Sequence, residues 1–128
     1  MDANEREFID RLVEDVIGAA YEVSNTLGSG FLEKVYERAL MRELILRNRC
    51  VETQARYSVM YKGAPVGDYY PDLIVEGRLV VELKCAEQLS NEHMAQCINY
   101  LKASGLHIAL LINFQRPKVQ WNRIVFNL

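Results

Sequence analysis

The chain has 128 residues, half of them hydrophobic and a quarter charged, a composition that predicts one globular domain over residues 1–128. Its net charge of −2 excludes a basic field over the whole protein, but counts less against an enzyme whose acidic ligands are neutralised by bound cations. The first eight residues are rich in charge and lack the apolar core of a signal peptide, and the longest aliphatic run, Ile108–Ile112, is too short to cross a bilayer. We therefore expect a cytoplasmic protein with no membrane partner.

Two helices are predicted in the N-terminal part of the chain. Apolar residues recur every four positions from Phe8 to Ala20, after a capping-box spacing at Asp2 and Glu5. This helix is expected to end at Gly28-Ser29-Gly30, because glycine permits the left-handed turn. A second amphipathic helix follows, with basic residues at its C-terminal end.

The middle of the chain changes to the two-residue period of β-strands. Residues 55–61 alternate as in a half-buried strand, and Lys62–Pro65 is expected to be a turn. Residues 68–75 and 79–84 are predicted to be two further strands, joined tightly at Glu76-Gly77.

The C-terminal part predicts a third helix and two more strands. Ser90 or Asn91 is expected to cap this helix, which runs to about Ala103 and ends at Gly105. The apolar run 108–113 is expected to be a central strand, and 119–126 a last one. The order α-α-β-β-β-α-β-β predicts an α/β (α+β) fold with a mixed sheet flanked by helices.

Three charged residues interrupt the apolar strands of the middle hairpin. Glu82 and Lys84 lie two apart and share one face of their strand. If the register pairs Asp72 with Glu82, the two carboxylates lie about 5 Å apart and repel each other. A divalent cation between them would remove the repulsion, and oxygen ligands suit Mg²⁺ or Mn²⁺. The alternative is a polar strand face that only contacts water.

These residues resemble the motif of the PD-(D/E)XK nuclease superfamily, here Pro71-Asp72 followed by Glu82-Leu83-Lys84 on a hairpin. Within that superfamily the chain resembles the small GxxExxY family over nearly its whole length. The matching positions are Gly30, Glu33, Tyr36, Tyr61-Lys62-Gly63, His93, Gln96, Asn99, Tyr100-Leu101-Lys102 and Leu111-Ile112-Asn113-Phe114. The resemblance implies a restriction-endonuclease-like core.

The resemblance also implies roles for the hairpin residues. Asp72, Glu82 and the backbone carbonyl of Leu83 would hold Mg²⁺ or Mn²⁺, and Lys84 would orient or help to deprotonate the attacking water. Glu33 would complete the site as a further ligand or a water-positioning carboxylate. Its alternative is a solvated helix glutamate.

The third helix supplies further candidates. His93, Gln96 and Tyr100 share one helix face that could contact the scissile phosphate or a base. Alternatively, Tyr100 is a core aromatic residue with a solvated hydroxyl, and Gln96 only caps a strand edge. His93 and Cys97 have a spacing that could suit a metal, but no further ligands are evident, so a buried Cys97 is favoured. Tyr36 is a further candidate substrate contact, although a packing role is the favoured interpretation.

The leading hypothesis is a metal-dependent nuclease acting on DNA or RNA. The competing hypothesis is a non-catalytic module on the same scaffold that binds nucleic acid or protein, and a purely structural protein is the third. One domain can cut one strand, whereas cutting two strands together would require a homodimer.

Overall fold

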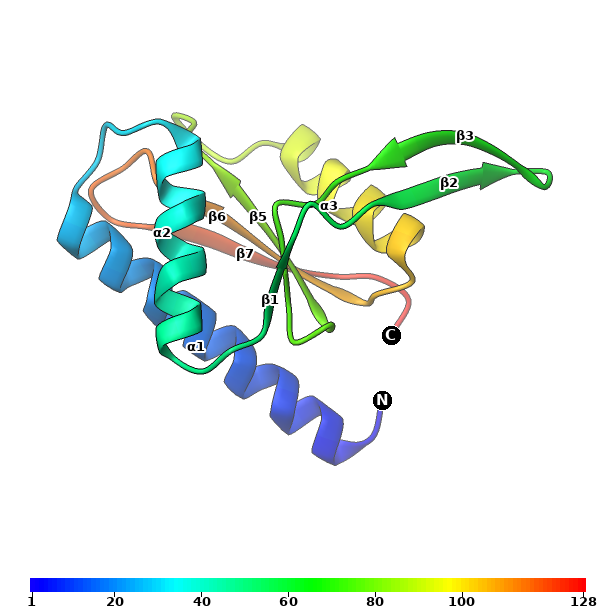
Figure 1. Ribbon diagram of the computed structural model, residues 1–128, viewed down its shortest axis with the longest axis horizontal. Coiled ribbons are helices and arrows are strands. Elements are labelled where there is room, and N and C mark those ends of the chain that lie inside the picture. Colours follow the sequence, from blue (N-terminus) through cyan, green and yellow to red (C-terminus); the bar gives the residue numbers. More distant parts are fainter.

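Three helices and seven strands follow one another along residues 1–128, which the computed structural model describes in full (Figure 1). The helices are α1 (Ala3–Leu27), α2 (Glu33–Leu46) and α3 (Asn91–Ser104). The strands are β1 (Val51–Thr53), β2 (Tyr57–Tyr61), β3 (Ala64–Tyr69), β4 (Leu73–Val75), β5 (Leu79–Lys84), β6 (Ile108–Asn113) and β7 (Gln120–Val125).

Five of the strands form a mixed sheet in the order β1-β4-β5-β6-β7. β5 and β6 pair in parallel through the connecting helix α3, and the other pairs are antiparallel. All six residues of β6 are buried, as the unbroken apolar run 108–113 predicts for a central strand. The mixed sheet flanked by helices confirms the predicted fold class.

The sheet separates two apolar layers because alternate residues of each strand point to opposite faces. Leu73, Val81 and Ile112 pack with α1 and α2, whereas Val80 and Leu111 pack with α3. Side chains at even-numbered positions of β5 therefore face α3, and those at odd-numbered positions face α1 and α2.

Two details differ from the strand order that the sequence predicts. The segment 68–75 is not one strand, because β3 ends at Tyr69 and β4 begins at Leu73. Pro71 has no N–H for the ladder, and the N–H of Asp72 donates to a side chain instead. The short β1 was not predicted, and it pairs with β4 at the edge of the sheet.

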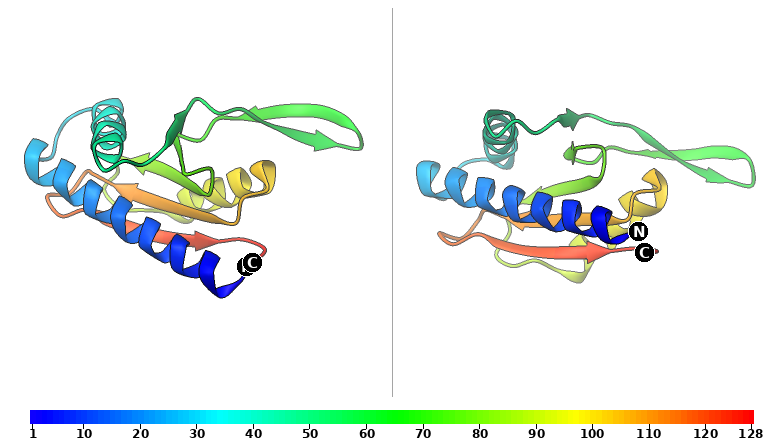
Figure 2. Two further views of the ribbon diagram at one scale, coloured as in Figure 1. Left: turned by 60° about the horizontal axis from the view of Figure 1, so that its bottom comes forward. Right: turned by 90° about the horizontal axis from the view of Figure 1, so that it is seen from below.

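β2 and β3 form a separate two-stranded hairpin that projects from the sheet beyond α3 (Figures 1 and 2). Its turn is the two-residue pair Lys62-Gly63, with φ of 47° and 83°, the conformation that suits a tight hairpin. Ala64 and Pro65, predicted to be part of the turn, instead begin β3. The hairpin leads through Tyr70 and Pro71 directly to Asp72.

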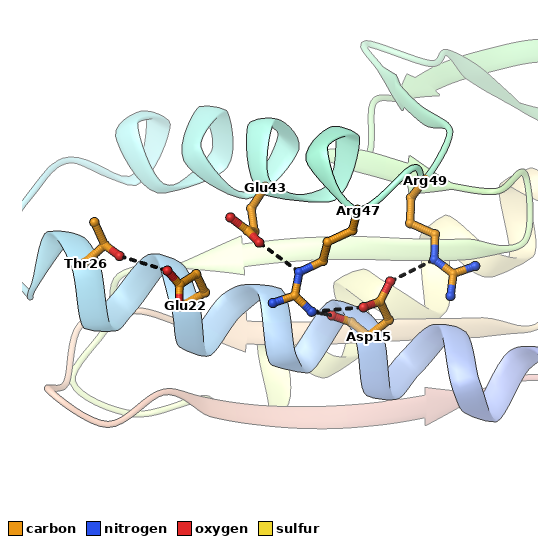
Figure 3. A network of polar contacts seen from close by, with 6 residues as sticks. All are labelled: Asp15, Glu22, Thr26, Glu43, Arg47 and Arg49. Carbon is orange, nitrogen blue, oxygen red and sulfur yellow. Dashed lines mark hydrogen bonds and ion pairs between the residues drawn. The ribbon is translucent and has the colours of Figure 1, made fainter.

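A network of ion pairs fastens the C-terminal end of α2 to α1 (Figure 3). The guanidinium of Arg47 contacts Asp15 at 2.9 Å and Glu43 at 2.8 Å, and Arg49 contacts Asp15 at 2.8 Å. Partial burial alone would raise the pKa of Asp15, but the hydrogen bonds from Arg49 and Arg47 outweigh it and lower that pKa. The network fixes the orientation in which α2 crosses α1.

The N-terminal end of α2 is fixed by a buried tyrosine. The Tyr36 hydroxyl donates to the carbonyl of Gly28 at 2.6 Å and accepts from the N–H of Phe31 at 3.2 Å. Its ring stacks on Phe114 with centroids 4.8 Å apart. The connection between α1 and α2 is thereby held against the end of β6. Among the helices, none has the length and apolar character needed to span a membrane.

Candidate active site

The register of β4 and β5 brings two carboxylates to one end of the hairpin. The ladder pairs Leu73 with Val81, so the next pair beyond it is Asp72 and Glu82. Each side chain then accepts a backbone hydrogen bond from the opposite strand. The Asp72 N–H donates to Glu82 Oε1 at 2.7 Å, and the Leu83 N–H donates to Asp72 Oδ2 at 2.9 Å.

The two carboxyls lie in a poorly solvated place. Glu82 is 2% exposed, and Asp72 is partly buried. Burial, followed by repulsion from Asp72, raises the pKa of Glu82. Burial also raises the pKa of Asp72, and nearby carboxylates add to that effect. The pair therefore holds its protons more tightly than exposed acids do, unless a positive charge is bound.

A third carboxylate, Glu37 of α2, faces the pair and was missed by the sequence analysis. Among the groups that raise the pKa of Asp72, Glu37 comes directly after burial. Its side chain is 14% exposed and contacts Lys34 Nζ at 2.6 Å. The signal was its position one helical turn after Glu33, which puts both residues on one face of α2.

Glu33 is exposed at the first position of α2, where the helix N-terminus favours a negative charge. After burial and the nearer groups, its charge contributes to the raised pKa of both Asp72 and Glu82. α2 thus presents two carboxylates toward the end of the β4–β5 hairpin.

Lys84 ends β5 on the same strand face as Glu82 and is partly buried. Its charge lowers the pKa of Glu82, against the larger effects of burial and Asp72. None of the ion pairs within 4 Å involves Lys84, so Lys84 forms no salt bridge with Asp72 or Glu82. The ammonium group is near the carboxylates but free of them.

The oxygen atoms of Asp72 and Glu82 suit a hard divalent cation in an open site. They are not part of a closed site, because no group of three or more His, Cys, Asp or Glu side chains lies close enough together to enclose a metal ion. Mg²⁺, however, is commonly held by one or two carboxylates and keeps several of its waters. Asp72 and Glu82, with the Leu83 backbone carbonyl, would provide such an open set of oxygen donors, and a bound cation would offset their mutual repulsion.

The face of α3 that carries His93, Gln96 and Tyr100 lies near the same carboxylates, but the three side chains differ in burial and in hydrogen-bond partners. The Gln96 amide donates to the Tyr100 hydroxyl at 3.3 Å, and Tyr100 is 6% exposed, with its ring edge-on to Tyr69. Burial, followed by the charges of Glu82 and Asp72, raises the pKa of Tyr100. Tyr100 therefore packs between the five-stranded sheet and the β2–β3 hairpin. Its hydroxyl lies close enough to Asp72 and Glu82 for their charges to affect its pKa.

His93 and Cys97 do not form a metal site in this structure. His93 Nδ1 accepts from the Ser90 N–H at 3.1 Å, and the Ser90 hydroxyl accepts from the His93 N–H, so His93 caps α3. Cys97 is fully buried, and burial raises the pKa of its thiol to about 12. Tyr36 is 1% exposed, and this burial favours the packing interpretation over substrate contact.

Solved structures share this arrangement of sheet and helices. The protein SSO0001 is similar with a TM-score of 0.56 and 18% identity over 74% of this chain, which spans 50% of that protein. An alkaline exonuclease from Laribacter hongkongensis, LHK-Exo, has a TM-score of 0.52 and 12% identity, with 84% of this chain and 76% of the other covered. Its complex with dAMP has the same TM-score and identity, with 89% and 82% covered.

At these identities the similarity shows the fold alone. No curated protein matches the chain. The model of the PD-(D/E)XK nuclease superfamily matches residues 10–124, which include α2, the β4–β5 hairpin and α3. The chain therefore belongs to the PD-(D/E)XK nuclease superfamily.

Proposed function

We propose that the protein hydrolyses phosphodiester bonds in DNA or RNA with the help of Mg²⁺ or Mn²⁺. One observation carries this proposal. The buried carboxyl of Glu82 and the partly buried carboxyl of Asp72 face each other at the end of the β4–β5 hairpin, with the unpaired ammonium of Lys84 nearby. Two acids with raised pKa values in a cleft are costly to the fold, and a role in binding a cation explains them.

In this proposal Asp72, Glu82 and the Leu83 carbonyl hold the ion. When bound, the ion supplies a Lewis acid for the phosphoryl oxygen and makes a water molecule more acidic. Lys84 orients that water and stabilises the negative charge that develops on the phosphate. Glu33 positions the water or accepts its proton. The amide of Gln96 can donate to a phosphate oxygen once it leaves Tyr100, and His93 would contact the substrate through Nε2.

We also propose that the chain belongs to the GxxExxY family within the superfamily. Gly30, Glu33 and Tyr36 are spaced as in the GxxExxY family, and their places in the fold support the assignment. Gly30 has a φ of 107°, which a residue with a side chain rarely adopts. Glu33 begins α2, and Tyr36 holds the preceding loop.

A cleavage assay tests the proposed activity. Labelled single- and double-stranded DNA and RNA are incubated with wild type in Mg²⁺, Mn²⁺ or EDTA. We expect cleavage only with a metal, and none by Asp72→Ala. Asp68→Ala is the matched control, because Asp68 is an exposed acid of the hairpin that contacts only Ser58. Equal cleavage by Asp72→Ala and Asp68→Ala would refute the assigned site.

The competing function is a non-catalytic module that binds nucleic acid or protein. The net charge of −2 favours the protein-binding form of this module, since a net negative protein has no general attraction to phosphates. The similarity to LHK-Exo, an exonuclease that was solved in complex with dAMP, supports a nucleic acid substrate instead. Absence of cleavage across all substrates and metals would favour the binding module. A homodimer and a cytoplasmic location are further proposals, and a sedimentation experiment decides the first.

A further inference from the structure

A polar cavity of about 240 Å³ opens on the outer side of Asp72, between α2 and the segment that follows β1. It is bounded on one side by the carboxylate that we propose as a metal ligand. The other polar residues that line it are Lys34, Glu37, Arg38, Thr53, Gln54 and Tyr70. The proposed catalytic roles use none of these six residues.

The cations of this cavity are not equivalent. Lys34 is held by Glu37 at 2.6 Å, and that contact is the main reason why the pKa of Lys34 is raised. Arg38 lies one helical turn later, is exposed, and takes part in none of the ion pairs within 4 Å. The cavity thus offers a guanidinium with no carboxylate partner, and such a group binds phosphate oxygens in pairs.

The opposite wall combines an aromatic ring with hydrogen-bonding groups. Tyr70 is 53% exposed although it lies only two residues before Asp72. Gln54 has a φ of 58°, a conformation that residues other than glycine rarely adopt and that is often kept for a function. Its amide, together with the Thr53 hydroxyl, could pair with the polar edge of a base. The exposed ring can stack on the face of that base.

We propose that this cavity is a subsite for one nucleotide with an unpaired base, adjacent to the phosphate that the metal site cleaves. The base stacks on Tyr70 and its edge meets Gln54 and Thr53, while Arg38 binds a phosphate of the same strand. This inference rests on the proposed function, because it takes Asp72 as the neighbouring reactive end. It names the substrate class as a strand with at least one unpaired nucleotide.

The chemistry discriminates between single strands and duplexes. In a duplex both faces of a base are covered by stacked neighbours, and its pairing edge is occupied. A base can therefore reach Tyr70 and Gln54 only from a single strand, a frayed end or a bulge. DNA and RNA both offer bases that can stack, polar base edges and phosphates, so the test includes a strand of each.

The experiment measures binding, so that it does not depend on catalysis. Fluorescence anisotropy of a labelled short strand is recorded with Ca²⁺ in place of Mg²⁺, and intact strands are verified on a gel. We expect Tyr70→Ala to raise the Kd for single-stranded DNA or RNA about tenfold. Arg38→Gln should raise the Kd similarly and reduce the salt dependence by about 0.7 in the log–log slope. The blunt duplex of the same sequence should bind more weakly and respond little to Tyr70→Ala.

Two controls match the variants. Tyr61→Ala removes a similarly exposed tyrosine from the β2–β3 hairpin, and Arg6→Gln removes from α1 an exposed arginine that forms no ion pair. Neither residue lines the cavity. A strand made entirely of abasic nucleotides separates the two contacts, because it should lose affinity with Arg38→Gln and not with Tyr70→Ala.

The outcomes distinguish this inference from the proposed function. If single strands bind to Tyr70→Ala and Tyr61→Ala equally well, or if duplexes bind best, the subsite is refuted even where wild type cleaves with Mg²⁺. If the Tyr70 and Arg38 effects are found and no substrate is cleaved, the subsite stands and the nuclease proposal fails. Circular dichroism of each variant confirms that it is folded.

Discussion

Lys84 has an unusual position for a lysine, since it lies beside two acids and is bound to neither. In the metal-free protein its removal therefore breaks no ion pair, and Lys84→Met should keep nearly the wild-type Tm. If its charge acts on the water and the phosphate, cleavage should fall about 10²–10³-fold, as for other single electrostatic groups in active sites. The control is Lys118→Met, because Lys118 is an exposed lysine. Cleavage by Lys84→Met at the wild-type rate would show that the lysine has no catalytic part.

Glu82 predicts how stability depends on pH without metal. Burial raises the pKa of Glu82 in the folded state above its unfolded value of about 4.3, so the folded protein binds the extra proton. The stabilisation of the folded state by this proton is fully present below the unfolded pKa of Glu82 and is lost as pH rises through the raised folded pKa. In EDTA, the Tm of wild type should therefore decline as pH rises from the unfolded pKa of Glu82 to its raised folded pKa, and the Tm of Glu82→Gln should decline less over that range.

The matched control for this pH series is Glu14→Gln, because Glu14 is exposed on α1. Its Tm profile should follow that of wild type. A profile of Glu82→Gln that also coincides with wild type would mean that Glu82 is ionised at no cost to the fold.

At the scale of the elements, α2 is placed by contacts at both of its ends. The Arg47 network holds one end on α1, and the Tyr36 hydroxyl holds the loop before the other end. Added bulk at Gly18 would reach Arg47, since a Cβ there would lie 3.2 Å from Nη1. These contacts decide where Glu33 and Glu37 lie relative to the β4–β5 hairpin.

Tyr36→Phe tests this placement. The variant keeps the stacking on Phe114 but leaves the Gly28 carbonyl and the Phe31 N–H without their partner. We expect a loss of about 1–2 kcal/mol in the free energy of unfolding, measured with urea. The cleavage rate of the folded fraction should change little. A large loss of cleavage at wild-type stability would instead assign Tyr36 to the substrate.

At the scale of the whole molecule, a cation that binds only the folded state must stabilise it. With millimolar Mn²⁺ or Mg²⁺ at about 100 times the Kd, the gain is about 2.7 kcal/mol and Tm rises. Asp72→Asn should weaken this rise because one anionic ligand is lost. Asp68→Asn should keep it. An equal rise in both variants would place the cation elsewhere on the protein.

The sequence alone determined the elements whose signals are local. The run 108–113 has the length and apolarity of a central strand, and β6 has those bounds. Ser90 and Gly105 mark the ends of α3 because caps depend on neighbouring backbone groups. The sequence left open the register that sets Asp72 opposite Glu82. A two-residue turn at Glu76-Gly77 would pair Val75 with Arg78, whereas in the structure Arg78 belongs to the turn and Val75 pairs with Leu79.

Only the tertiary structure decided what surrounds the pair. Glu37 and Arg38 are distant from Glu82 along the chain, and the packing of α2 brings them to the cavity that Tyr70 and Asp72 also line. The separation of Lys84 from the carboxylates and the pairing of β1 with β4 are likewise features of the folded chain. Periodicity records which face of an element is buried, but not which element covers it. The hairpin motif was therefore predictable from the sequence, whereas the cavity beside Asp72 was not.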